Sequence, residues 1–188
     1  SSMNLKKPAK TSMPAEAGND GNNSITGTWG ASASDNSDYR VKNGVMNYIK
    51  RQYTFQPNGT YCFVSKAFDP LMNNIFLGKE TGTYISSGNT ITVIPKKSVL
   101  EAWSKKDGTD NWGKFINSKE IALEKTTYQF TKHYFSGIQE WNLVLQSSKA
   151  TQRDGPFSNN TTFTNCWYYR PISYTNKLIE YPDREKEE

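Results

Sequence analysis

The chain has 188 residues, a formal net charge of +5 and 35% hydrophobic residues, which fits one domain and argues against two well-built ones. Phe, Tyr and Trp make up 13% of the chain, and because aromatic side chains favour strands, an all-helical bundle is disfavoured. No apolar run approaches the ~18–20 residues of a membrane-spanning helix, and the basic residues are too dispersed to indicate a nucleic-acid surface.

The composition divides the chain into three parts. Residues 1–24 carry Ser, Asn, Gly, Pro, Lys and Ala with no periodicity and no large aromatic residue, which predicts a flexible tether. Residues 182–188 are almost all charged or polar and predict a charged tail. We therefore expect one folded unit at 25–181.

The first strong signal in this unit is a β-hairpin. Gln56-Pro57-Asn58-Gly59-Thr60 has Pro, Asn and Gly in the order that suits a three-residue loop, a type I turn followed by a bulge. This loop places Tyr53 opposite Phe63 and Phe55 opposite Tyr61. The four rings then share one face, which we expect to be the buried one.

Further hairpins follow along the chain. Ser87-Gly88 predicts a two-residue turn that pairs Tyr84 with Ile91. The runs 126–135 and 140–146 form another pair, with Tyr128 and Phe130 on one face, and 162–170 reads as the last strand.

One segment predicts a helix. Ser98-Val99-Leu100-Glu101 has the form of a capping box, and the helix would continue to Lys106 within a polar excursion at 96–125. Its apolar side, which includes Trp103, must dock on the rest of the domain. It would either cover an opening, with Trp103 and Trp112 as a lid, or pack on the outer wall.

Seven to nine antiparallel strands leave a barrel and a sandwich open, and two motifs favour the barrel. The first strand opens Gly27-Thr28-Trp29, and Arg170 closes the last strand, which resembles the lipocalin and fatty-acid-binding (calycin) pattern. In that family the Trp plugs the closed end of the barrel and the Arg packs across its indole.

The middle of the chain strengthens the resemblance. The run from Tyr53 to Phe63, then Gly82-Thr83-Tyr84 and Gly88–Val93, looks like the bacterial lipocalin-like domains, which are often secreted or lipid-anchored. The resemblance implies an all-β fold, a single antiparallel up-and-down β-barrel of about eight strands with one short helix in the long excursion. Gly27, Trp29 and Arg170 are structural in that family.

Residues able to carry chemistry are few. His133 is the sole histidine, so no Cys/His zinc site can be assembled. Alternation points His133 outward, with a haem ligand or a general base as the alternatives. Cys62 and Cys166 form either a disulfide or two small buried thiols. Arg153-Asp154-Gly155-Pro156-Phe157 predicts a turn, either a plain surface loop or a guard at the barrel mouth. We expect no enzyme activity, no cofactor and no metal.

The leading prediction is therefore a non-enzymatic barrel that binds a small hydrophobic or amphipathic ligand. Its expected lining is the following set of aromatic residues: Tyr53, Phe55, Tyr61, Phe63, Tyr84, Tyr128, Phe130 and Trp103. The alternative is a tethered cell-envelope module for protein–protein interaction, with a barrel filled by its own side chains. We expect a monomer with no nucleic-acid partner, and membrane association only through a lipid anchor outside this sequence. Because 1–24 resembles the linker after a bacterial lipoprotein's acylated cysteine, the expected location is periplasmic or outer-surface.

Overall fold

The computed structural model describes residues 24–34, 41–42, 45–159 and 162–183. The predicted tether at 1–24, apart from Ser24, lies outside the described residues. So does the predicted tail at 182–188, apart from Pro182 and Asp183.

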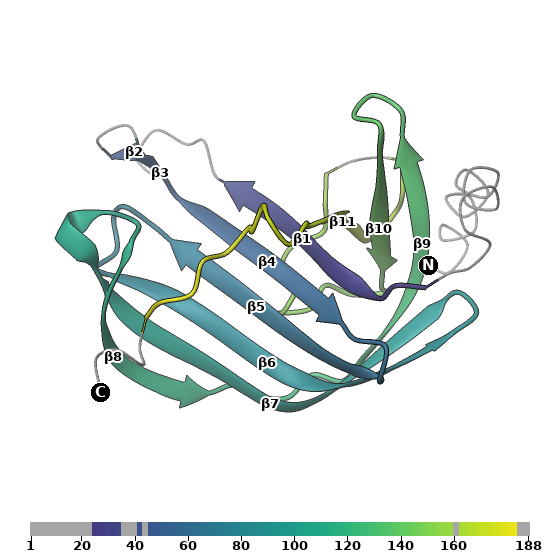
Figure 1. Cartoon of the computed structure of the whole chain (residues 1–188), viewed down its shortest axis with the longest axis horizontal. Helices are drawn as coiled ribbons and strands as arrows, with labels where there is room; N and C mark the ends of the chain where they lie inside the picture. Colours follow the sequence, from purple (N-terminus) through teal and green to yellow (C-terminus); the bar gives the residue numbers. More distant parts are fainter. Residues whose placement is uncertain (1–23, 35–40, 43–44, 160–161, 184–188) are drawn as a thin grey trace.

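In the described part of the chain, the secondary structure is almost entirely antiparallel β-strand (Figure 1). The strands are β1 (Gly27–Ser34), β2 (Val41–Lys42), β3 (Val45–Met46), β4 (Tyr48–Phe55), β5 (Thr60–Phe68), β6 (Asn74–Ser87), β7 (Thr90–Lys105), β8 (Trp112–Glu120), β9 (Thr126–Phe135), β10 (Glu140–Gln146) and β11 (Cys166–Pro171).

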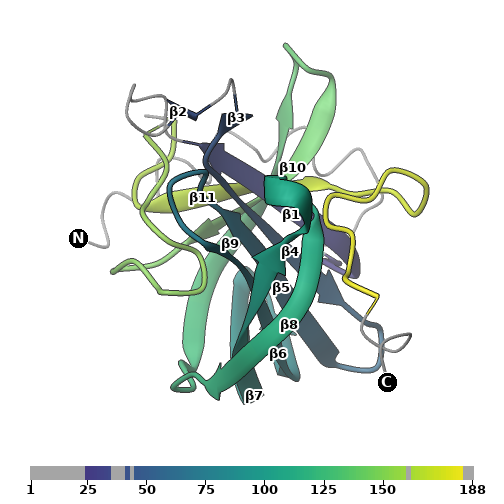
Figure 2. The ribbon, with the colours of Figure 1, turned by 90° about the vertical axis from the view of Figure 1, so that its left-hand side faces the viewer.

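Nine of these strands form one sheet in the order β6-β5-β4-β1-β11-β10-β9-β7-β8. Since β6 also pairs with β7, eight of the nine close into a ring, and β8 is attached outside the ring to the second half of β7 (Figures 1 and 2). The β9–β10 hairpin projects beyond its neighbours at the top of both views. The predicted all-β, barrel-like antiparallel fold of about eight ring strands is confirmed.

The β4–β5 hairpin has the predicted loop and register. Gly59 has a φ of 87°, in the left-handed region that the bulge requires, and the Gln56 N–H donates to the Thr60 carbonyl at 2.9 Å. Tyr53 lies opposite Phe63, as expected. Phe55 and Tyr61 are also opposite each other and buried.

The β6–β7 hairpin differs from the prediction by two residues. Ser87 pairs with Thr90, and Gly88, with a φ of 59°, is the first central residue of the turn. This is the position at which a type II′ turn needs glycine. Tyr84 therefore lies opposite Val93 rather than Ile91. A slip of two keeps every side chain on its expected face.

The predicted helix at 98–106 is wrong. These residues continue β7, which pairs with β6 as far as Asn74 opposite Ser104, and the helical structure nearby is a 3-10 turn at Lys106–Gly108. A four-residue capping pattern is a weak local preference, and the long pairing with β6 outweighs it. The Glu101 carboxylate, which would have capped the helix, pairs with Lys79 at 2.8 Å and accepts the Trp103 indole N–H at 3.0 Å.

Of the two placements left open for Trp103, the structure has packing on the outer wall and not the lid. Glu101 lies opposite Leu77 and Trp103 opposite Ile75, and Leu77 is on the face of β6 turned away from the ring interior. Trp103 forms an outer cluster with Leu77 and with Ile179 of the C-terminal segment, which crosses the outside of the sheet in Figure 1. Trp112 lies beside this cluster and donates its indole N–H to the Glu180 carbonyl at 2.7 Å.

The packing of Arg170 across Trp29, which the resemblance implied, is not found. Trp29 faces the interior, is 8% exposed and donates its indole N–H to the Ile25 carbonyl at 2.8 Å. Arg170 follows the inward-facing Tyr169 and is exposed on the outer face, 3.3 Å from the Glu140 carboxylate. The two side chains are therefore on opposite faces of the sheet. The last strand also starts at Cys166, four residues later than predicted, because Asn165 has a left-handed φ of 49°.

Candidate functional site

The aromatic residues expected to line a ligand pocket mostly pack against one another. Tyr53 is fully buried, with its ring centroid 4.8 Å from that of Phe63 and 5.1 Å from that of Tyr169. Tyr128 and Phe130 from β9 belong to the same buried cluster. The interior around Tyr53, Tyr128 and Tyr169, here called the filled half, therefore has little room for a ligand.

A loop from outside the strands completes the filled half. The segment between β10 and β11 turns at Thr151–Gly155, where the Gly155 N–H donates to the Thr151 carbonyl at 2.9 Å. This turn places Arg153 and Asp154 inside the ring, where they are 7% and 2% exposed. The prediction of a surface loop or mouth guard at Arg153–Phe157 is therefore wrong for these two charged residues.

Asp154 accepts hydrogen bonds on both carboxylate oxygens. Tyr53 and Tyr169 each donate a phenol O–H to Oδ1 at 2.6 Å, and Tyr128 donates to Oδ2 at 2.5 Å. The Thr151 hydroxyl donates to Oδ2 at 2.5 Å. A buried carboxylate is costly unless its lone pairs are satisfied, and here four O–H donors from four segments of the chain satisfy them.

The phenols remain protonated donors. Burial raises the pKa of Tyr53, Tyr128 and Tyr169, and the nearby charge of Asp154 raises the pKa of each further. The arrangement holds these hydroxyls as neutral groups that tie β4, β9 and β11 to one turn. We interpret it as structural.

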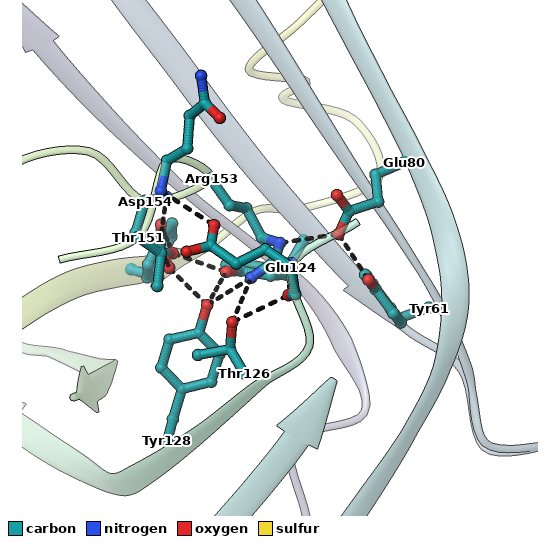
Figure 3. Close-up of polar contacts among 11 residues, drawn as sticks. Tyr61, Glu80, Glu124, Thr126, Tyr128, Thr151, Arg153 and Asp154 are labelled. Atoms are coloured by element: carbon teal, nitrogen blue, oxygen red, sulfur yellow. Dashed lines mark hydrogen bonds and ion pairs between the residues drawn. The ribbon is translucent and has the colours of Figure 1, made fainter. Parts of the chain in front are cut away.

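Arg153 extends this network across the ring to Glu80 of β6 and Tyr61 of β5 (Figure 3). Its Nε donates to Glu80 Oε2 at 2.8 Å, and the same oxygen accepts the Tyr61 phenol at 2.6 Å. Its Nη1 donates to the Tyr128 hydroxyl at 2.9 Å, and its Nη2 donates to the Glu124 carbonyl at 2.7 Å. Burial lowers the pKa of Arg153, but the surrounding phenols and carboxylates outweigh this and raise it overall.

The opposite end of the same strands is hollow. A cavity of about 320 Å³ lies over the inner faces of β4, β5, β6 and β7, and another of about 380 Å³ adjoins it towards the β5–β6 turn. The two cavities share four lining residues: Ile49, Arg51, Ala67 and Phe76. We call the interior around these four residues the hollow half.

The strands explain why this end stays open. Along β4 and β5, the inward positions change from Tyr53, Phe55, Tyr61 and Phe63 to smaller side chains at Ser65 and Ala67. Gly78 on β6 leaves further room, because it lies opposite Ser65 and carries no side chain.

Of the eight residues predicted to bind a ligand, Phe63 lines the cavity of about 320 Å³. The other aromatic residues of this set lie in the filled half or at its edge, except Trp103, which is on the outer face. The residues that the sequence analysis missed are Ile49, Arg51, Ala67, Phe76 and Leu100. The alternation that placed Tyr53 and Phe55 inward extends back to Arg51 and Ile49, so this signal was available in the sequence.

His133 faces outward, as predicted, but it is not a free surface residue. Its ring packs edge-on against Phe135 and Phe163, with centroids 4.5 and 5.2 Å away. Cys166 is buried in the neighbouring outer cluster, and both it and Cys62 are free thiols. Among the described residues, no group of three or more His, Cys, Asp or Glu side chains could hold a metal ion.

No family model matches the chain, and no curated protein is significantly similar to it.

Proposed function

We propose that this chain is a non-enzymatic binding protein for a small apolar or amphipathic molecule, held in the hollow half of the ring. The observation that carries the proposal is the pair of adjoining cavities inside an otherwise well-packed ring. In the filled half the aromatic side chains pack against one another, so the ligand would lie against Ile49, Ala67 and Phe76.

The lining supports an apolar ligand. Ile49, Ala67, Phe76 and Leu100 are only half-buried, although they point into the ring, so their apolar surface faces the cavity. Covering apolar surface is worth ~25 cal/mol per Å². A volume of about 320 Å³ is at the lower end of the ~300–1,000 Å³ that small-molecule sites occupy.

Within this proposal, the bacterial lipocalin-like family is the candidate family. The eight-stranded ring and the inward Trp29 near the start of β1 support it, whereas the outward Arg170 departs from the family pattern. A periplasmic or outer-surface location with a lipid anchor follows from the same resemblance and stays a prediction. In the described residues, no helix has the length and apolar character needed to cross a membrane.

A titration with the neutral fluorophore N-phenyl-1-naphthylamine tests the proposal. We expect saturable binding to the wild-type protein and its loss in Ala67→Phe, because the new ring would occupy space in both cavities. Thr127→Phe is the control, since it adds the same ring at an exposed position of β9. No saturable binding, or binding unaffected by Ala67→Phe, would reject the proposal.

The alternative, a protein–protein interaction module, has one observation in its favour. Leu71 and Met72 are adjacent in the β5–β6 turn and are 49% and 51% exposed. Adjacent exposed apolar residues are typical of a contact surface. If the fluorophore fails to bind while Leu71→Ser/Met72→Ser prevents capture of a partner, this alternative is favoured.

A further inference from the structure

We propose that the ligand carries a single negative charge and that Arg51 is the counter-ion that selects it. This inference rests on the proposed function, because it assigns a chemical class to a molecule bound in the hollow half.

Arg51 is the charged residue that lines both cavities. It is on β4, in the inward register of Tyr53 and Ile49, and it lines both the cavity of about 320 Å³ and that of about 380 Å³. A ligand in either cavity would lie beside its guanidinium group. The other lining residues that the two cavities share are apolar.

The guanidinium of Arg51 lacks a partner within the part of the chain that the structure describes. No hydrogen bond or ion pair to it is formed among these residues. A cation in a concave, partly apolar site without a counter-ion is unfavourable, because it loses hydration and gains no compensating attraction.

The neighbouring interior charges are arranged differently. Arg153 is paired with Glu80 at 2.8 Å, and the Asp154 oxygens accept four O–H donors. Arg153 and Glu80, which also line the cavity of about 320 Å³, therefore neutralise each other, whereas Arg51, which lines both cavities, has no counter-ion among the described residues. An anionic group on the ligand would complete the set.

The guanidinium is also held in place by its surroundings. A side chain at Gly155 would bring its Cβ into a clash with Nη2 of Arg51, so the absence of a side chain at this position makes room for the guanidinium. Gly155 belongs to the turn that carries Arg153 and Asp154. Arg51 thus rests against a fixed backbone, which favours a directed, two-pronged contact with a carboxylate.

The cavity volume limits the size of the ligand. At ~30 Å³ per water-sized group, a volume of about 320 Å³ holds roughly ten heavy atoms. Octanoate has this size, with an apolar chain for Ile49, Ala67 and Leu100 and a carboxylate for Arg51. Octanol matches it without the charge.

Another role for Arg51 makes a different prediction. Its charge acts on Tyr169, which donates to Asp154, so Arg51 could instead serve to balance the charge of Asp154 at a distance. In that case, removing its charge would lower stability and leave ligand preference unchanged.

The experiment is competition against N-phenyl-1-naphthylamine at pH 7 with octanoate and octanol. We expect wild-type protein to bind octanoate at least about tenfold more tightly than octanol, the order of one charge-assisted contact. Arg51→Gln should remove this preference, and Arg51→Lys should keep part of it. The preference is the ratio of the two competition constants, so a change in fluorophore affinity cancels. Lys50→Gln is the matched control, because it removes one positive charge from the preceding residue of the same strand, which faces outward.

The outcomes separate the two proposals. If the wild-type protein does not bind the fluorophore, the proposed function fails, and this inference fails with it. If the fluorophore binds but octanoate has no advantage over octanol, the proposed function stands and the inference is overturned. A preference that survives in Arg51→Gln, with or without a loss of thermal stability, overturns the assignment to Arg51.

Discussion

The two halves of the ring interior are built on the same strands and differ in what fills them. β4, β5 and β6 run through both halves with one inward alternation, and β7 runs through both with a bulge after Pro95 that shifts its inward positions by one residue. In the filled half, the inward side chains are mostly aromatic, and their phenols contact the polar turn at Thr151–Gly155. In the hollow half, they include Ser65, Ala67 and Gly78, which leave the cavities open. The inward side chains and the loops, and not the strand framework, therefore decide whether the interior of the barrel-like sheet has room for a ligand.

The turn at Thr151–Gly155 is the boundary between the halves. Towards the filled half, Asp154 of this turn accepts hydrogen bonds from three phenols. Towards the hollow half, Gly155 lies against Arg51. Changes in this turn should therefore act on stability through Asp154 and on ligand binding through Arg51.

The largest effect is expected for Asp154→Asn. The amide nitrogen of Asn cannot accept a hydrogen bond, so the two hydroxyls on the replaced oxygen lose their acceptor in a buried site. These are either the hydroxyls of Tyr53 and Tyr169 or those of Tyr128 and Thr151. We expect the free energy of unfolding to fall by about 3–5 kcal/mol, measured by urea denaturation. Tyr53→Phe removes one donor and should cost less, ~1.5–3 kcal/mol. An Asp154→Asn variant that is more stable than Tyr53→Phe would contradict this account of the filled half.

Arg153→Met should have the next largest effect, about 3 kcal/mol, because it leaves the Glu80 carboxylate buried without its cation. The Tyr61 phenol still donates to Glu80, which moderates the loss. Combining Arg153→Met with Glu80→Gln should cost less than the sum of the single changes, since the double variant buries no unpaired charge. Additive losses in denaturation experiments would show that the ion pair contributes nothing specific.

Gly155→Ala tests the link between the halves. Gly155 has a φ of 77°, which costs a residue with a side chain about 1–2 kcal/mol, and the new methyl group would displace the Arg51 guanidinium. We expect lower thermal stability together with weaker octanoate binding. Gly88→Ala is the control, because its φ of 59° is also positive but nothing lies within 4 Å of its Cβ position. Equal effects of Gly155→Ala and Gly88→Ala on octanoate binding would show that Gly155 does not act on the ligand through Arg51.

The fold was largely predictable from the sequence because its signals are local. Asn58-Gly59 and Gly88 define turns, and the alternation of Tyr53 and Phe55 defines a buried face. The helix at 98–106 failed for the opposite reason. Its capping pattern spans four residues, whereas the competing β6–β7 pairing joins residues that are 18 (Glu80 and Ser98) to 30 (Asn74 and Ser104) positions apart.

The site was much less predictable, since it depends on a loop that has no periodic pattern. Arg153-Asp154-Gly155 has the composition of a surface turn, and nothing local indicates burial. One indirect signal existed: the inward alternation puts the phenols of Tyr53 and Tyr128 inside the ring, and buried hydroxyls need polar partners. That signal predicts a polar group inside the barrel but does not identify Asp154.

The outer face of the sheet lies outside both halves of the interior. There, the pH dependence of protein stability tests the burial of His133. Burial lowers the pKa of His133, and its Nδ1 is buried with no hydrogen-bond partner among the described residues. The unfolded chain, with an ordinary pKa of ~6.5, therefore binds the proton first as the pH falls. Stability that is fully present above pH ~6.5 should decline as the pH drops towards the lower folded pKa. Since His133 is the one histidine in the chain, His133→Leu should flatten this part of the pH–stability curve. An unchanged slope would show that His133 is protonated without cost.

The smallest effect is expected for Arg170→Ala. The side chain is exposed, its contact with Glu140 is 3.3 Å long, and exposed ion pairs contribute ~0–1 kcal/mol. Trp29 is different, because its indole is part of the filled half, and Trp29→Ala should cost ~3–5 kcal/mol through lost burial and a residual cavity. If the indole and guanidinium shared a cation–π contact, the double variant would lose less than the sum of the single variants. Because the two side chains are on opposite faces of the sheet, we expect the losses to add within ~0.5 kcal/mol. A larger coupling energy, measured by a double-mutant denaturation cycle, would restore the family packing of Arg170 on Trp29 and extend the filled half to the end of β11.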